Sequence, residues 1–209
     1  MHALSIRFAL VAGLALSAGC QSQRIQPTQL SDSAVTLDLP LVHQDALYEC
    51  GLASMSALCQ YWGVEIPDAE RASLAREAEE KKGLSGGELR TALNDLGLEV
   101  FLFHGTLDRS PTGLYRHVDA GRPPLVMLAL GNGDDSNHHY CLVLGYDESR
   151  GNLILLDPIK GQVLTPTAVF DRNWERCERF TLLACPADRT SEVAMGPSFT
   201  TYPQGEPKP

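Results

Sequence analysis

Hydrophobic and polar positions divide residues 38–187 into a helical first part and a strand-rich second part. Apolar and small residues recur with helical spacing from Cys50 to Trp62, where Gly63 provides an end. The same period returns at residues 67–82, PDAERASLAREAEEKK. These patterns predict two amphipathic helices before any strand begins.

A third helix is predicted over residues 86–97, because Ser85 and Glu88 have the spacing of a capping box. EVFLF then reads as a strand, and PTGLYRHVDAG, residues 111–121, reads as a helix. Four further strand candidates follow, at residues 124–130, 138–146, 152–157 and 179–185. Since helices come first and strands later, we predict an α+β fold, with N-terminal helices packed on a C-terminal antiparallel β-sheet.

The two ends of the chain lack this pattern. An apolar run from Phe8 to Leu16, with the small residues SAG before Cys20, is typical of a signal peptide and too short for a permanent membrane span. The motif resembles the lipobox of bacterial lipoproteins, which implies a signal peptide over 1–19 and lipidation of Cys20. Ordinary signal cleavage nearby is the alternative. We expect residues 20–37 to form a lipid-anchored tether and residues 188–209 a disordered tail.

A lipidated Cys20 would hold the protein on a bacterial membrane outside the cytoplasm. The next residue is Gln21, not the Asp that resembles an inner-membrane retention signal. The expected location is therefore the cell envelope, at the outer membrane and facing the periplasm.

Composition excludes one class of partner. The 209 residues carry a formal net charge of −9, and Lys and Arg form no cluster of the kind that binds nucleic acid. We predict no cofactor, since the SGG of residues 85–87 suits a helix cap and lacks the context of a phosphate-binding loop. We also predict no metal site, because GDDSNHH, residues 133–139, reads as a solvated loop entering a strand.

A nucleophile is indicated at the start of the first helix. The N-terminus of a helix lowers the pKa of a thiol placed there, and Cys50 occupies that position. We expect Gly51 to leave space for a substrate carbonyl. The backbone N–H of Cys50 and the side-chain amide of Gln44 are candidate donors to the oxyanion that forms when the thiol attacks.

The base and its orienting partner are predicted from two neighbouring strands. His139 opens one strand, and Asp157 ends the next, so a hairpin turn over DESRGN would place them side by side. His138 is the weaker candidate, because alternation sends it to the opposite face. In this arrangement His139 accepts the thiol proton and Asp157 orients the imidazole.

The blocks QDALYECG, HYCLVLGY and LLDPIKG together resemble the bacteriocin-processing cysteine peptidases, the thirty-ninth cysteine-peptidase family, over residues 38–187. The resemblance implies a papain-like fold with Cys50 as nucleophile, His139 as general base and acid, Asp157 as orienting residue and Gln44 as oxyanion donor. Typical members cleave leader peptides after a double glycine and are fused to an ABC transporter at the cytoplasmic face. No transporter segment is evident here, and the predicted signal indicates the other side of the membrane.

We therefore expect a cysteine peptidase acting on a peptide or protein substrate at the periplasmic membrane surface. Two alternatives remain: an acyl transferase that uses the same thioester, and a catalytically silent lipoprotein that binds a peptide or partner. Trp62 and Trp174 are expected to pack in the core. The pairing of the remaining cysteines stays open, with Cys177–Cys185 the nearest candidate in sequence; the others are Cys59 and Cys141.

Overall fold

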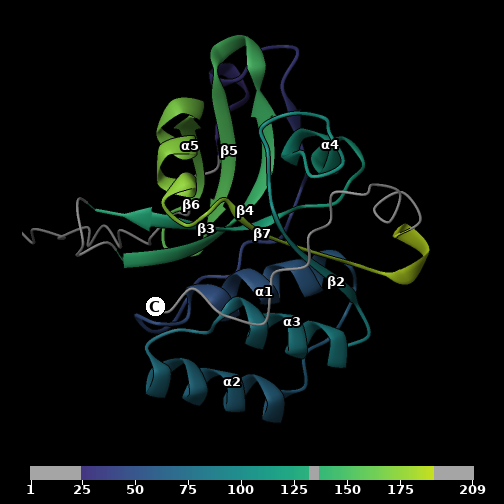
Figure 1. The fold of residues 1–209 in the computed structure, drawn as a ribbon, viewed down its shortest axis with the longest axis vertical. Coiled ribbons are helices and arrows are strands. Elements are labelled where there is room, and N and C mark those ends of the chain that lie inside the picture. Colours follow the sequence, from purple (N-terminus) through teal and green to yellow (C-terminus); the bar gives the residue numbers. More distant parts are fainter. Residues whose placement is uncertain (1–24, 132–136, 191–209) are drawn as a thin grey trace, which may run out of the picture.

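Seven strands form one sheet in which every strand pairing is antiparallel (Figure 1). The computed structural model describes residues 25–131 and 137–190. The strands are β1 (Val35–Thr36), β2 (Glu99–His104), β3 (Leu125–Leu130), β4 (Asn137–Asp147), β5 (Asn152–Asp157), β6 (Gly161–Pro166) and β7 (Phe180–Cys185). Their order is β2-β7-β3-β4-β5-β6, with β1 paired to β4.

Helices cover both faces of this sheet. They are α1 (Cys50–Tyr61), α2 (Asp68–Lys81), α3 (Gly86–Asp95), α4 (Leu114–Asp119) and α5 (Thr167–Glu175). The first three lie together below the sheet in Figure 1 and share one hydrophobic core with it. The other two pack on the opposite face around a second core. The α+β class predicted from the sequence is confirmed.

Strand β4 belongs to both cores at once. Tyr140, Leu142 and Leu144 face the first core, whereas Cys141 and Val143 face the second. Successive side chains of a strand point to opposite faces, so a strand covered on both sides needs apolar residues at every position. That requirement explains the unbroken apolar run that made this strand easy to predict.

Helix boundaries follow their capping residues. Glu88 N–H donates to Ser85 Oγ over 3.2 Å, and Ser85 N–H donates to Glu88 Oε2 over 2.7 Å, which confirms the predicted capping box. The first helix ends at Tyr61, one residue before the predicted end, and Gly63 follows with a φ of 70°. Sequence pattern thus located these helices to within about a turn.

Three elements, β1, β6 and α5, were not predicted. Most β6 residues are half-buried, as expected of an edge strand that offers no strong alternation. Within the short α5 only Phe170 and Trp174 are buried, and both lie in the second core. Trp174 is therefore a packing residue, as predicted. Trp62 packs against the first core and donates its Nε1–H to the Ala184 carbonyl over 2.9 Å.

Residues 25–37, expected to be part of the tether, pack against the sheet instead. Ser31 donates its N–H and Oγ–H to the carboxylate of buried Asp147, over 2.8 and 2.7 Å. Val35 and Thr36 then form β1 against β4. A Cβ at Gly145 would lie 2.1 Å from the Val35 carbonyl oxygen, so only glycine admits this strand. The packed region therefore begins before Asp38.

Several expectations fall on residues that the structure does not describe. Residues 1–24 and 191–209, which include the expected signal peptide, Cys20 and most of the expected tail, lie outside the described ranges. Within residues 25–131 and 137–190, no helix has the length and apolar character that crossing a membrane requires.

The contact between Ser31 and Asp147 leads to a stability prediction. Replacing Ser31 with Ala removes one hydrogen bond to a buried carboxylate and should lower the free energy of unfolding by about 1–2 kcal/mol. Ser33→Ala is the matched control, because Ser33 makes only exposed hydrogen bonds and should cost less than about 0.5 kcal/mol. Urea unfolding of both variants measures the difference. Equal free energies of unfolding for Ser31→Ala and Ser33→Ala would mean that the hydrogen bond from Ser31 to Asp147 does not stabilise the fold.

Candidate active site

Cys50 is the first residue of α1, as predicted. The preceding residue, Glu49, does not cap the helix with its side chain; its Oε2 accepts N–H bonds from Asp45 and Ala46, both over 3.2 Å. The Glu49 side chain therefore does not cap the first N–H groups of α1. These groups lie beside the Cys50 thiol, and Cys50 is 9% exposed. This is a position at which a thiolate is favoured.

Close packing of α1 on β4 sets the place of this thiol. A Cβ at Gly51 would lie 3.2 Å from the ring of Tyr140, and Ser54 Oγ donates to the Tyr140 carbonyl over 3.3 Å. Gly51 is buried against that ring, so the expectation that it leaves space for a substrate carbonyl is wrong. Its missing side chain lets the helix approach the strand that carries His139.

His139 and Asp157 meet across the β4–β5 hairpin, as the sequence predicted. His139 Nε2 lies 3.2 Å from Asp157 Oδ1, and both side chains are more than nine-tenths buried. Leu142 pairs with Leu156, so the next pair along this antiparallel ladder brings Asp157 opposite Cys141. Cys141 is two residues from His139, and the two side chains therefore lie on the same face of β4. His138 is exposed on the other face.

A turn after β5 fixes the carboxylate of Asp157. Its Oδ1 accepts the backbone N–H groups of Ile159, over 2.8 Å, and Lys160, over 3.2 Å. The same turn anchors the segment before α1, because the Pro158 carbonyl accepts the N–H of Gln44 over 3.1 Å. Asp157 and the segment that leads to Cys50 are therefore held by one short stretch of chain.

Opposing effects set the ionisation of the three groups. Burial raises the pKa of the Cys50 thiol, but hydrogen bonding to His139 and backbone hydrogen bonds from Tyr140 and Gly51 outweigh it, so that this pKa lies below its ordinary value. Burial lowers the pKa of His139, yet Asp157 and the neighbouring thiols raise it above the ordinary value. A thiolate–imidazolium pair is the favoured state.

Gln44 lies near the site, but its amide hydrogens point elsewhere. Nε2 donates to the carbonyls of Ala46, over 2.8 Å, and Leu47, over 3.2 Å. The side-chain oxygen is buried and accepts no hydrogen bond from the described residues. The side chain would have to rotate to donate to an oxyanion, so its role stays a prediction.

One neighbour of the site was missed in the sequence analysis. Cys141 is buried, and its sulfur lies with a ring nitrogen of His139 and a carboxylate oxygen of Asp157 in one group in which no two of these atoms are more than 4.8 Å apart. Alternation along β4 was the signal that could have found it, because residues 139 and 141 share a face. All the described cysteines are free, so the Cys177–Cys185 disulfide that the sequence left open does not form.

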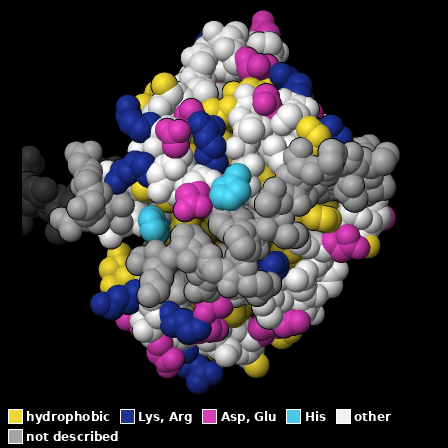
Figure 2. All heavy atoms as spheres, in the orientation of Figure 1, with side chains coloured by type: hydrophobic (Ala, Val, Ile, Leu, Met, Phe, Trp, Pro, Cys, Tyr) yellow, Lys and Arg dark blue, Asp and Glu magenta, His cyan; other side chains and the backbone are white. Residues whose placement is uncertain are grey.

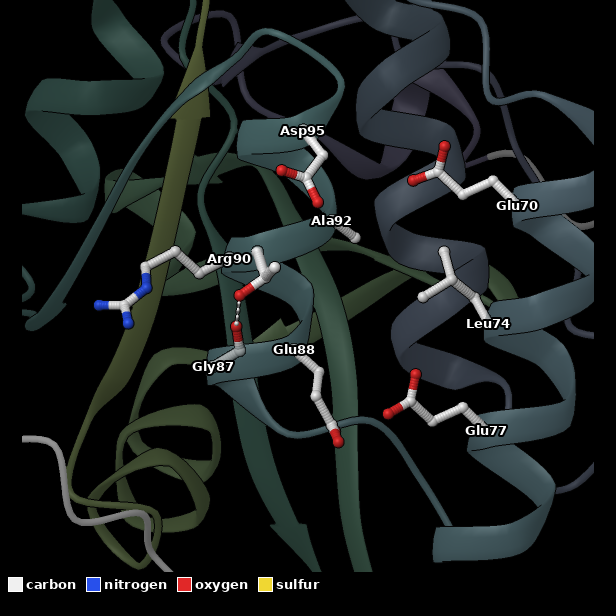
Figure 3. A pocket seen from close by; sticks show the side chains of 9 residues that line it. Glu70, Leu74, Glu77, Gly87, Glu88, Arg90, Ala92 and Asp95 are labelled. Atoms are coloured by element: carbon white, nitrogen blue, oxygen red, sulfur yellow. Dashed lines mark hydrogen bonds between the residues drawn. The ribbon is translucent and has the colours of Figure 1, made fainter.

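A pocket of about 410 Å³ elsewhere on the molecule contains none of these residues. It lies between α2 and α3, whose side chains face one another across it (Figure 3). Glu77 and Glu88 on its rim both pair with Lys81, and Glu88 also caps α3. These carboxylates are already partnered within the fold. On the face drawn in Figure 2, basic and acidic side chains are interspersed among the described residues.

A mixed helix and antiparallel-sheet fold with a thiol, imidazole and carboxylate in this order defines the papain-like class. The model of the Peptidase C39 family matches residues 38–186, and the chain belongs to that family. Membership supports a peptidase function. No curated protein sequence matches significantly.

Solved structures of C39 peptidase domains share the fold. A double-glycine-motif protease from an AMS/PCAT transporter, in complex with a leader peptide, has a TM-score of 0.57 at 18% identity, covering 74% of this chain and 98% of its own. A putative C39-like peptidase from Bacillus anthracis gives 0.58 at 20%, with coverage of 74% and 98%. The peptidase domain of Streptococcus ComA, a bifunctional ABC transporter, gives 0.54 at 22%, with coverage of 70% and 97%.

The shifted pKa values lead to a prediction about thiol reactivity. At about pH 6–7, below the ordinary thiol pKa of about 8.5, iodoacetamide should alkylate Cys50 rapidly because the thiolate is already formed. Asp157→Asn removes the carboxylate that raises the pKa of His139, and should slow alkylation about tenfold at that pH.

His139→Ala should slow alkylation further, and raising the pH to about 9.5 should restore most of the rate in both variants, because a free thiol ionises there. Mass spectrometry of the Cys50 peptide against time measures these rates. His138→Ala is the control, since His138 is exposed on the other face of β4. Rates independent of His139 would contradict the ion pair.

Proposed function

We propose that the protein is a cysteine peptidase that hydrolyses a peptide bond in a peptide or protein substrate at the periplasmic surface of a bacterial membrane. The proposal rests on one observation above all, the buried 3.2 Å contact between His139 and Asp157 beside the thiol at the start of α1. A base oriented by a carboxylate and hydrogen-bonded to a thiol is the arrangement that activates a nucleophile.

In the first half-reaction the Cys50 thiolate attacks the carbonyl carbon of the scissile bond. The negative charge that develops on the carbonyl oxygen is met by the Cys50 N–H at the helix start and, after rotation of its side chain, by the amide of Gln44. His139 gives its proton to the leaving amine nitrogen, the C–N bond breaks, and a thioester remains.

Water completes the reaction. Neutral His139 takes a proton from the water, which attacks the thioester carbonyl; the C–S bond breaks, and the Cys50 thiolate returns beside a protonated imidazole. Asp157 keeps the imidazole oriented through both halves, because its own oxygen is fixed by the N–H groups of Ile159 and Lys160.

The loops that frame this site expose apolar side chains. Leu47 is 74% exposed in the segment before α1, and Ile159 is 55% exposed in the turn after Asp157. The hydrogen bond from Gln44 to Pro158 joins these two loops. We infer that apolar residues of the substrate bind at this rim. Cleavage after a double glycine is the first specificity to test, since a structurally similar protease is described with that motif.

Peptide cleavage provides the direct test. The full chain should cleave a peptide that carries a double glycine preceded by apolar residues, and Cys50→Ser should lower kcat at least a thousandfold while leaving the fold intact. Cys59→Ser is the matched control, since Cys59 lies on the same helix away from the site. Activity retained in Cys50→Ser would refute the mechanism. Amide products formed only with added amines would assign an acyl transferase instead.

The location is a separate proposal with its own test. Cells expressing the full chain with a labelled fatty acid should incorporate label into the protein, and the protein should sediment with outer membranes. Cys20→Ala should abolish both results, whereas Cys59→Ala should change neither. Label retained in Cys20→Ala, or a protein found free in the periplasm, would overturn the assignment of Cys20 as the lipidated residue.

A further inference from the structure

The site contains one more potential ligand than the peptidase reaction uses. Cys141 Sγ, a ring nitrogen of His139 and a carboxylate oxygen of Asp157 lie within 4.8 Å of one another, and all three residues are at least 94% buried. Sulfur, nitrogen and oxygen donors gathered in this way match the ligand set of zinc and similar borderline cations. The proposed peptidase reaction uses His139 and Asp157 but not Cys141.

Hydrogen bonding leaves one of these atoms available. His139 Nε2 lies 3.2 Å from Asp157 Oδ1 but makes no hydrogen bond of good geometry with any of the described residues. A buried nitrogen without an aligned partner is unusual and calls for an explanation. Because Nε2 faces Asp157, the other ring nitrogen is the one left for Cys50.

The surroundings of Cys141 do not call for a thiol. It packs in the second core beside Val143 and Leu155, where a valine would serve equally well. A cation bound nearby would displace the proton of the Cys141 thiol, since a thiol that coordinates a metal is deprotonated.

We propose that Cys141, His139 and Asp157 form an inhibitory site for a thiophilic divalent cation, with Zn²⁺ as the expected occupant. A water molecule supplies the fourth ligand. Ligand atoms around tetrahedral zinc lie about 3–4 Å apart, so the three side chains need to draw together by about 1 Å.

Binding of the cation displaces two protons. Cys141 releases its thiol proton to solvent on binding the cation, and the His139 imidazolium releases the proton on Nε2; Asp157 is already ionised. With the cation on Nε2 and the remaining proton on Nδ1, His139 can neither accept a proton from water nor form an imidazolium with Cys50. The cation therefore blocks both half-reactions. This regulatory consequence rests on the proposed peptidase function, whereas cation binding does not.

Cobalt provides a spectroscopic probe of the site. Co²⁺ added to the full chain should produce a thiolate-to-cobalt charge-transfer band that saturates at one ion per chain, and Zn²⁺ should abolish it by displacement. Cys141→Val should remove the band or weaken Co²⁺ binding at least tenfold. Cys177→Val is the matched control, a buried cysteine outside this group, and should behave as wild type.

Cys141→Ser serves as the second variant if the valine variant does not fold, and circular dichroism decides this. A band of unchanged strength in either folded Cys141 variant, or no band in the wild type, would overturn the proposal. Weak binding shared by every variant would likewise identify adventitious surface binding only.

Alkylation of Cys50 separates this proposal from the peptidase function. Zn²⁺ should slow alkylation at least tenfold in the wild type and less than twofold in Cys141→Val. Slow alkylation without any metal, together with a normal cobalt band, would refute the peptidase and leave the cation site standing. Fast alkylation that Zn²⁺ does not change, with no band, would refute the cation site and leave the peptidase standing.

Discussion

The docking of the N-terminal end of α1 on strand β4 is the contact on which the rest of the site depends. Gly51 has no side chain to hold the helix away from the Tyr140 ring, and Ser54 donates to the Tyr140 carbonyl. The neighbouring residue on each element belongs to the candidate site, Cys50 on the helix and His139 on the strand. This close contact between a helix and a strand thereby sets the separation of thiol and imidazole, without relying on flexible loops.

The turn after β5 has a similar effect on the other side of the imidazole. It fixes the Asp157 carboxylate with two backbone N–H groups, and through Pro158 it holds the segment that carries Gln44. Parts of the chain more than a hundred residues apart are in this way assembled around one ring. The hairpin register, and not any local motif, determines which carboxylate meets the base.

Burial acts on these groups in opposite directions, and the balance defines the chemistry. Desolvation alone would leave Cys50 a thiol and His139 neutral, but their mutual contact and the Asp157 carboxylate favour the charged pair. A low-dielectric site with several ionisable groups is sensitive to any further charge. The buried Cys141 belongs to this environment, so a cation bound beside it would act directly on the pair.

The sequence alone determined the fold class, the first three helices, the main strands and the grouping of Cys50, His139 and Asp157, because these depend on periodicity, capping and the geometry of one hairpin. It did not reveal α5, β6 or the packing of residues 25–37, since their stability comes from contacts made only in the folded state, such as Phe170 and Trp174 in the second core and Ser31 on Asp147. The tertiary structure alone decided that Gly51 serves the helix–strand contact, that the Gln44 amide faces its own loop, and that Cys141 lies beside the base. Each depends on distances between elements that no spacing along the chain can specify.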